Sequence, residues 1–313
     1  MAESLFPSNE KGGEKPRRKP SHKKGDFQSA TAFMSMDESD IDKVRRNAYL
    51  RSKGISPADP LQLDLLFPDT LNDGQRVIPN DYARSSLFTT RNKREPRRTL
   101  QHEKLFHLHD GVSILFTGIE LRAEDDEVVW LQILHYAKSV PLGEPFDFTI
   151  KQLVADVGWS KNGRYYDKAR ECISRLKANE VMVFNEKAFG KSGAISLIDK
   201  YTMLNDAEGK PLNYRVWIDP NLIVLFAGNT FTNHAWLTYR NLSPVARRLA
   251  DYIESHQYPF PLEVEKFKGM CGSLSQELKG WRRTVRQACT EVEQQRIAKR
   301  AVLNEDDKIY IVR

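Results

Sequence analysis

The chain has 313 residues, which leaves room for two domains of ordinary size and a tail. Lys and Arg total 48 against 42 Asp and Glu, so the net charge of +6 is modest and an anionic partner must be argued from where the cations cluster. The sequence contains no run of 18 apolar residues and no apolar core behind its N-terminal charges, which argues against membrane insertion and secretion and favours a cytoplasmic protein.

The N-terminal region is polar, with a basic cluster between Lys15 and Lys24. Residues 1–61 hold too little apolar surface to offset the entropy of ordering, so they are predicted to form a disordered basic tail. The motif QLDLLF follows, and it is either a strand or staple that packs on the first domain or a linear peptide for a partner's groove. It comprises Gln62, Leu63, Asp64, Leu65, Leu66 and Phe67. Residues 68–104 are predicted to be a basic connecting segment, most basic at 89–98 (TTRNKREPRR).

The first folded domain is predicted over residues 105–228. It opens with a hairpin of two strands, 105–108 and 112–121, which meet at the strong turn signal Asp110-Gly111. A helix over 124–139 follows, with acidic residues at its positive end and an apolar stripe along one side.

Two further helices and a set of strands complete this first domain. Thr149-x-x-Gln152 is a capping box that opens the next helix, and Ser160 is predicted to cap the third, whose outer face is basic. Strands over 181–184, 195–204 and 214–218 are predicted to form a wing.

The second domain is predicted over residues 229–313. Ser243-Pro244 pairs an N-cap residue with Pro at the first helical position. Ser273-x-x-Gln276 is a second capping box in front of a second basic helix. Strands over 297–303 and 308–312 are predicted to close the chain as a wing hairpin.

Seven apolar or turn-forming positions recur at a fixed offset of 114 residues and relate the two domains. The pairs are Pro145 and Pro259, Phe146 and Phe260, Phe148 and Leu262, Ile150 and Val264, Leu153 and Phe267, Val157 and Cys271, and Gly158 and Gly272. Helix, turn, basic helix and hairpin make a winged-helix unit, a module that reads DNA. The sequence therefore predicts an α+β protein with two tandem winged-helix domains preceded by a disordered N-terminal tail.

The predicted DNA-binding residues lie on the two basic helices and in the basic stretch before the first domain. A basic helix face is usually only solvated, but the third helix of a helix-turn-helix is held out by the first two, so its free face fits a major groove. Arg can there bond bidentately to guanine and Gln to adenine, while Lys and Arg hold phosphates. The residues are Lys161, Arg164, Lys168, Arg175, Lys279, Arg282, Arg283, Arg286, Gln287, Arg91, Lys93 and Arg94.

Catalytic and metal-binding interpretations find little support. His107 and His109 alternate on a predicted strand, but no further ligand has suggestive spacing. The acidic residues 124–126 point in different directions on a helix and suit its positive end better than a metal. The sequence shows no glycine-rich phosphate loop and no nucleophile–base arrangement, and its three cysteines have the positions of reduced core thiols. We therefore expect a binding protein without a metal or cofactor, not an enzyme.

Five stretches carry a resemblance to a known family. They are PNDYARSSLFTTRNKREPR (79–97), GIELRAEDDEVVW (118–130), GWSKNGRYYDKARECISRL (158–176), IVLFAG (223–228) and LSPVARR (242–248). These stretches closely resemble the TrfA-type replication initiators of broad-host-range IncP plasmids. The resemblance runs from about Gln62 to the C-terminus, and the tail before it is divergent.

The resemblance implies a plasmid-encoded bacterial protein that binds direct repeats (iterons) at an origin, opens the adjacent A+T-rich DNA and helps to load the host helicase. It implies as partners double-stranded origin DNA, single-stranded A+T-rich DNA, the host initiator and replicative helicase, and a second copy of the chain. It also implies that QLDLLF, one residue longer than the tightest such motif, engages the host sliding clamp. The alternatives are a winged-helix transcriptional repressor and an origin-acting nuclease or relaxase, although the chain lacks the His-rich metal site that the latter needs.

Overall fold

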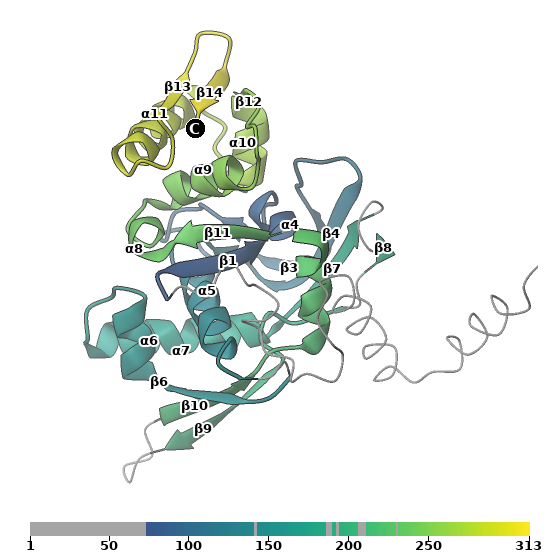
Figure 1. Cartoon of the computed structure of the whole chain (residues 1–313), viewed down its shortest axis with the longest axis vertical. Helices are drawn as coiled ribbons and strands as arrows, with labels where there is room; N and C mark the ends of the chain where they lie inside the picture. Colours follow the sequence, from purple (N-terminus) through teal and green to yellow (C-terminus); the bar gives the residue numbers. More distant parts are fainter. Residues whose placement is uncertain (1–72, 141–142, 186–189, 192–193, 206–210, 230) are drawn as a thin grey trace, which may run out of the picture. The chain divides into compact units, whose positions relative to one another are not determined.

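The computed structural model describes residues 73–313 apart from 141–142, 186–189, 192–193, 206–210 and 230 (Figure 1). The predicted tail and the motif at 62–67 lie outside the described residues. The described part falls within one structural unit, Val44–Arg313, and mixes helices with small sheets. None of its helices is both long and apolar enough to cross a bilayer.

Two segments share one order of helices and strands, and we call them the first and second repeats. The first repeat comprises α5 (Asp126–Ala137), β6 (Phe146–Thr149), α6 (Ile150–Asp156), α7 (Gly163–Lys177), β9 (Lys200–Asn205) and β10 (Pro211–Trp217). The second comprises α9 (Pro244–Glu254), β12 (Leu262–Glu263), α10 (Val264–Met270), α11 (Leu278–Gln294), β13 (Arg300–Leu303) and β14 (Lys308–Val312). The last strand of each repeat lies at the centre of an antiparallel sheet, in the orders β6-β10-β9 and β12-β14-β13.

The two helices that precede the basic helices, α6 and α10, start 114 residues apart. α6 begins at Ile150 and α10 at Val264, and each spans seven residues. Gly158 and Gly272 follow with φ of +80° and +58°, the left-handed region that favours glycine. Glycine at these two positions lets the chain leave one helix and turn towards the next, so the predicted repeat is confirmed as a repeat of structure.

Two of the four predicted helix caps are confirmed. The hydroxyls of Thr149 and Ser243 accept backbone N–H bonds at 3.0 and 3.3 Å and cap α6 and α9. The other two predictions were wrong. Asn162, not Ser160, caps α7, because it is Asn162 that directly precedes the first helical residue. Ser273 lies several residues before α11 begins, and its hydroxyl instead accepts a bond within the intervening turn.

A four-stranded sheet in the order β3-β4-β7-β8 has no counterpart among the described elements of the second repeat. It consists of β3 (Thr99–Leu105), β4 (Val112–Ile119), β7 (Asn179–Asn185) and β8 (Gly190–Lys191). The prediction of a wing strand over 181–184 was wrong, because β7 pairs along β4 instead. The predicted hairpin was also misplaced, since its first strand ends rather than begins at Leu105. β7 and β8 of this sheet lie in the long connection between α7 and β9.

The described residues of the predicted connecting segment, 73–104, are part of the folded body. β1 (Gln75–Pro79) pairs antiparallel with β11 (Phe231–Ala235), and β2 (Phe88–Thr89) pairs in parallel with β5 (Leu121–Arg122). The remaining short elements are α4 (Asn80–Ala83), η2 (Pro220–Asn229) and α8 (Trp236–Tyr239). Because β1 contacts α5 and β11 contacts α9, this strand pair joins the two repeats (Figure 1).

A buried guanidinium also joins the two repeats. Arg248 on α9 donates to the Glu127 carboxylate of α5 at 2.9 Å and to the carbonyls of Ala83 and Ser85 at 2.8 and 2.6 Å. Asp251 accepts a further bond from it at 2.5 Å. Burial, reinforced by the Asp251 charge, raises the pKa of Glu127 to about 7 although Arg248 opposes the shift. Buried charge pairs as well as apolar packing therefore fix the placement of one repeat on the other.

Candidate nucleic-acid interface

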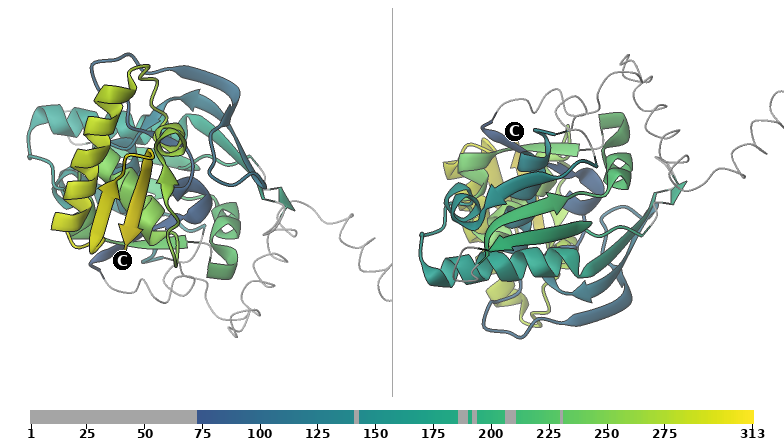
Figure 2. Two further views of the ribbon diagram at one scale, coloured as in Figure 1. Left: turned by 90° about the horizontal axis from the view of Figure 1, so that it is seen from above. Right: turned by 90° about the horizontal axis from the view of Figure 1, so that it is seen from below.

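The third helix of the second repeat, α11, has one apolar and one cationic side. Its buried side consists of Trp281, Val285, Ala288, Cys289 and Val292. Its opposite side exposes Lys279, Arg283, Arg286, Gln287 and Thr290. Within the described part of the chain, the charged groups of Lys279 and Arg283 take no hydrogen-bonded or ion-paired partner. These cations are free to bind an anionic ligand, and α11 runs alongside the yellow strands β13 and β14 (Figure 2, left).

Arg282 lies at the edge of this cationic side and is already engaged. Its Nε and Nη2 donate to the two carboxylate oxygens of Asp307, in the turn between β13 and β14, at 2.7 and 2.5 Å. Hydrogen bonding within the pair raises the pKa of Arg282 and lowers that of Asp307. Sequence reasoning missed Asp307, because it approaches Arg282 only when the hairpin of β13 and β14 folds back against α11.

The corresponding face of α7 in the first repeat is less cationic. At an offset of 116 residues the buried positions of the two helices coincide: Ala169 with Val285, Cys172 with Ala288, Ile173 with Cys289, and Leu176 with Val292. The same offset places at the positions of Arg283, Arg286 and Gln287 the residues Asp167, Arg170 and Glu171. Arg170 donates to the Asp167 carboxylate at 2.7 Å, so its charge is largely compensated on this face.

Two predicted DNA contacts at the start of α7 are accessible. Lys161 and Arg164 are exposed, and neither charged group is hydrogen-bonded or ion-paired within the ranges that the structure describes. They lie at the N-terminal end of the helix, whose backbone N–H groups also favour anions. This end of α7 therefore offers more to a phosphate than the middle of the helix does.

The other two predicted contacts on α7, Lys168 and Arg175, face the first turn of α5. Arg175 donates to Asp126 at 3.0 Å, and its side chain is only 12% exposed. The Lys168 ammonium lies 3.8 Å from Asp125 and 4.6 Å from the ring centroid of Trp159. Burial and the Asp125 charge raise the pKa of Asp126 to about 6, against the effect of Arg175. Both cations hold α7 against α5 in this structure.

The predicted DNA contacts in the basic stretch before β3 also include both engaged and accessible cations. Arg91 is 10% exposed and forms ion pairs with Glu95 and Glu120 at 2.8 and 2.6 Å. Lys93 is 70% exposed, and Arg94 is exposed as well. Two of the three cations predicted here to contact DNA are thus accessible, while Arg91 fixes the loop.

A cluster near the start of α5 resembles a metal site in composition but is already neutralised. Asp125, Asp126 and Cys172 bring potential ligand atoms within 4.8 Å of one another. The Arg97 guanidinium binds both carboxylates, at 2.9 and 2.6 Å, and Arg175 binds Asp126 as well. Burial raises the pKa of the Cys172 thiol well above its ordinary value, which disfavours the thiolate that a metal would need. We therefore assign no metal to this cluster.

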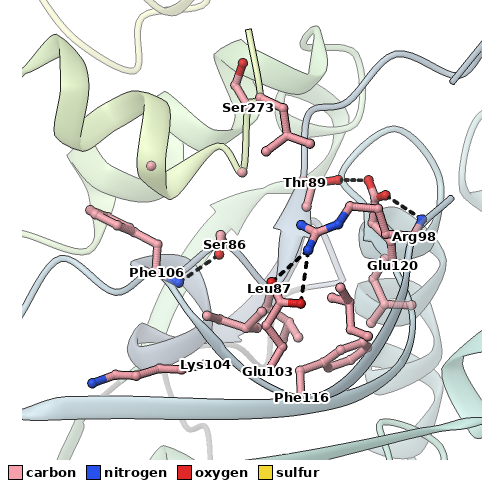
Figure 3. A pocket seen from close by; sticks show the side chains of 16 residues that line it. Ser86, Leu87, Thr89, Arg98, Glu103, Lys104, Phe106, Phe116, Glu120 and Ser273 are labelled. Carbon is pink, nitrogen blue, oxygen red and sulfur yellow. Dashed lines mark hydrogen bonds and ion pairs between the residues drawn. The ribbon is translucent and has the colours of Figure 1, made fainter. Parts of the chain in front are cut away.

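An apolar hollow of about 210 Å³ lies between β2, the β3–β4 hairpin and the end of α10 (Figure 3). Phe106, Phe116 and Leu274 are among its lining residues. Two pairs of polar groups at its wall bond each other: Thr89 donates to the Glu120 carboxylate at 2.6 Å and Arg98 to the Glu103 carboxylate at 2.8 Å. Because much of the remaining lining is apolar, the exposed cations remain the better candidate site.

Comparisons with known proteins agree on a family. The family model described as TrfA protein matches residues 38–313. A curated relative from Escherichia coli, named plasmid replication initiator protein TrfA, is 48% identical over 240 residues, which are 77% of this chain and 61% of the relative. The chain thus spans less than two thirds of that relative's length.

Two crystal structures of domains 2 and 3 of RctB are also similar to the chain. The first, of selenomethionine derivatives, has a TM-score of 0.48 and 10% identity, and covers 74% of this chain and 96% of its own. The second has a TM-score of 0.46 and 11% identity, and covers 72% of this chain and 92% of its own.

Proposed function

Because the chain belongs to the TrfA family, we propose that it is a plasmid replication initiator that binds direct repeats at its origin. Each repeat of the structure then acts as a winged-helix domain, with the domains at 105–228 and 229–313 and with residues from 73 onwards packed beside the first. The observation that carries the proposal is the exposed, unpaired cationic face of α11. A cationic helix face can also be simply solvated. That explanation is weaker here, because α11 is the third helix of a helix-turn-helix and a hairpin follows it.

In this proposal α11 enters a major groove. Arg283, Arg286 and Gln287 lie within about one turn of each other on the exposed side of the helix. Arg can bond to guanine O6 and N7 and Gln to adenine, and each bidentate contact contributes about 1–3 kcal/mol of discrimination. Lys279, at the N-terminal end of α11, suits a phosphate.

In this proposal the first repeat mainly contacts the phosphates of the DNA backbone. Lys161 and Arg164 at the start of α7, with Lys93 and Arg94 in the adjoining loop, are proposed to hold phosphates. Carboxylates on the outer face of α7 disfavour a close approach to DNA there. Arg175 takes no part, because moving it to DNA would leave the buried Asp126 carboxylate without one of its partners.

Later steps of initiation complete the proposal. After binding the repeats, the chain opens adjacent A+T-rich DNA, contacts the exposed single strand, and brings in the host initiator and replicative helicase. The motif at 62–67 is proposed to dock in the host sliding clamp while the repeats hold DNA. Dimers of the chain are proposed to form through the first domain and its extra strands, because β3 is an edge strand of the described four-stranded sheet and offers backbone groups for pairing.

Fluorescence anisotropy of the full chain, with a duplex selected by it from a random pool, tests the DNA-binding step. Replacing Arg286 with Ala should weaken binding to the selected duplex by about 1–3 kcal/mol if it contacts a base. Lys104→Ala is the matched control, because Lys104 is an exposed cation on β3 and not on either third helix, and its loss should change affinity little.

Wild-type affinity in all three α11 variants would exclude this helix as the one that reads bases. The variants are Arg283→Ala, Arg286→Ala and the double variant. A chain that binds one promoter tightly but supports no origin in a plasmid maintenance assay would be a repressor instead.

A further inference from the structure

The ion pair between Arg282 and Asp307 is partly open to solvent. The two side chains are 32% and 46% exposed, so the pair is not a core contact. Exposed ion pairs contribute little to stability, because water screens the charges and two long side chains must be ordered. A pair with near-ideal two-bond geometry, at the edge of a proposed DNA-reading face, therefore calls for another explanation.

Asp307 is held in place by more than its side chain. Its carbonyl accepts the backbone N–H of Val264, the first residue of α10, at 2.9 Å. Its backbone has φ of +56°, a left-handed conformation that few side chains other than Asn and Asp adopt readily. The carboxylate is thus fixed relative to the helix-turn-helix before any ligand arrives, and it fixes Arg282 in turn.

The geometry leaves one edge of the guanidinium free. Arg282 has five N–H donors, and Asp307 takes the Nε donor and one Nη2 donor. The two Nη1 donors and the second Nη2 donor remain unused among the described residues. One Nη1 N–H and the second Nη2 N–H are parallel along the neighbouring edge, the arrangement that matches O6 and N7 of guanine. We propose that Asp307 is a positioning residue that presents this edge of Arg282 to a guanine beside the wing and so sets base preference there.

The first repeat lacks this arrangement. At the offset of 116 residues the position of Arg282 is occupied by Tyr166, which offers no guanidinium. The carboxylate also lowers non-specific affinity, because it neutralises the charge that Arg282 would otherwise offer to phosphates at any sequence. Asp307 therefore raises the ratio of specific to non-specific affinity in two ways, by orienting Arg282 and by cancelling its attraction to phosphates.

Because the role of Asp307 rests on the proposed DNA binding, the test starts from the full chain and a duplex that it selects from a random pool. Each base pair of that duplex is then replaced in turn, and affinities are measured by fluorescence anisotropy at two salt concentrations. The variants are Asp307→Asn, Asp307→Gly and Arg282→Ala. Gly removes the side chain yet tolerates the positive φ, and Asn keeps both the shape and the backbone preference. Asp306→Asn is the control, because Asp306 lies in the same turn, loses the same charge and bonds Tyr310 instead.

For the wild type, replacing one particular G·C pair should weaken binding about tenfold or more. Asp307→Gly should reduce that penalty to about threefold or less while binding unrelated duplexes as tightly as the wild type or more tightly, since a repelling charge is gone. The penalty for Asp307→Asn should fall between those of the wild type and Asp307→Gly. Arg282→Ala should abolish the penalty, and adding Asp307→Gly to Arg282→Ala should leave the penalty unchanged. Asp306→Asn should keep the wild-type penalty.

Two results would overturn the role of Asp307 alone. One is a full guanine penalty retained in both Asp307 variants. The other is an equal loss of affinity for the selected and unrelated duplexes, which would make the pair only a clip that holds the wing. If instead the wild type selects no consensus from the pool, the proposed function itself fails and the role of Asp307 fails with it.

Discussion

Replacing Arg248 with Met should be among the most destabilising single changes in the described part of the chain. The Arg248 side chain is fully buried and bonds two carboxylates, on Glu127 and Asp251, and the carbonyls of Ala83 and Ser85. Met fills much of the same space but leaves the Glu127 carboxylate buried without its ion-pair partner, whereas Asp251 keeps His234 at 2.9 Å. Removing one member of a buried ion pair costs about 3–5 kcal/mol. For a domain of this size that loss lowers the melting temperature by about 6–20 °C.

Arg247 is the matched control for this change. It is the next residue along α9 and only 4% exposed, but its Nε and Nη1 have no hydrogen-bond partner within the described residues. Arg247→Met should therefore cost less than about 1 kcal/mol, since few bonds are lost. Glu127→Gln in the Arg248→Met background should recover part of the stability, because it removes one uncompensated buried charge. Thermal and urea melts followed by circular dichroism measure all three effects, and equal losses in Arg247→Met and Arg248→Met would refute the assigned role of the Arg248 network.

Three further predictions use simpler readouts. His234 is buried, which alone would lower its pKa, but neighbouring carboxylates raise that pKa to about 10. The folded state therefore keeps a proton that the unfolded state loses above pH 6.5, so stability should fall by up to about 1.4 kcal/mol per pH unit from pH 6.5 to 10, and His234→Gln should flatten this slope in urea melts. Thr149→Ala and Ser243→Ala should each cost about 1 kcal/mol in the same assay, and no loss at either would contradict the capping bonds. Leu65→Ala with Phe67→Ala should abolish binding to the bacterial sliding clamp in a pull-down while leaving DNA binding intact, whereas a loss of folding would make the motif core packing.

Local signals in the sequence predicted the parts of the fold that local chemistry decides. Thr149 and Ser243 begin their helices as expected, because a cap needs only its own hydroxyl and the next backbone N–H groups. The repeat also follows from local pattern, since the spacing of buried residues in α6 and α10 is set within each helix. The closing hairpin of β13 and β14 was predicted for the same reason.

Contacts between distant segments account for what the sequence did not predict. β7 pairs with β4 rather than with the wing, a choice made between strands far apart in the chain. Arg175 and Arg282 look like free cations in a helical pattern, yet Asp126 and Asp307 bind them once the chain has folded. A helical wheel separates a cationic side from an apolar side, but it does not show which cations a neighbouring element neutralises.

The two repeats share their buried positions but not their exposed residues. This difference bears on how the two repeats divide the proposed DNA contacts. The buried positions of α7 and α11 match, so the two helices face their cores in the same way. Their outer faces diverge: Asp167 and Glu171 stand in α7 where Arg283 and Gln287 stand in α11. Under the proposed function, a helix that carries carboxylates on its outer face gains little from the phosphate field, and base reading is assigned to α11. In the same proposal the first repeat contributes through a few exposed cations and through the buried contacts that hold it against the second repeat.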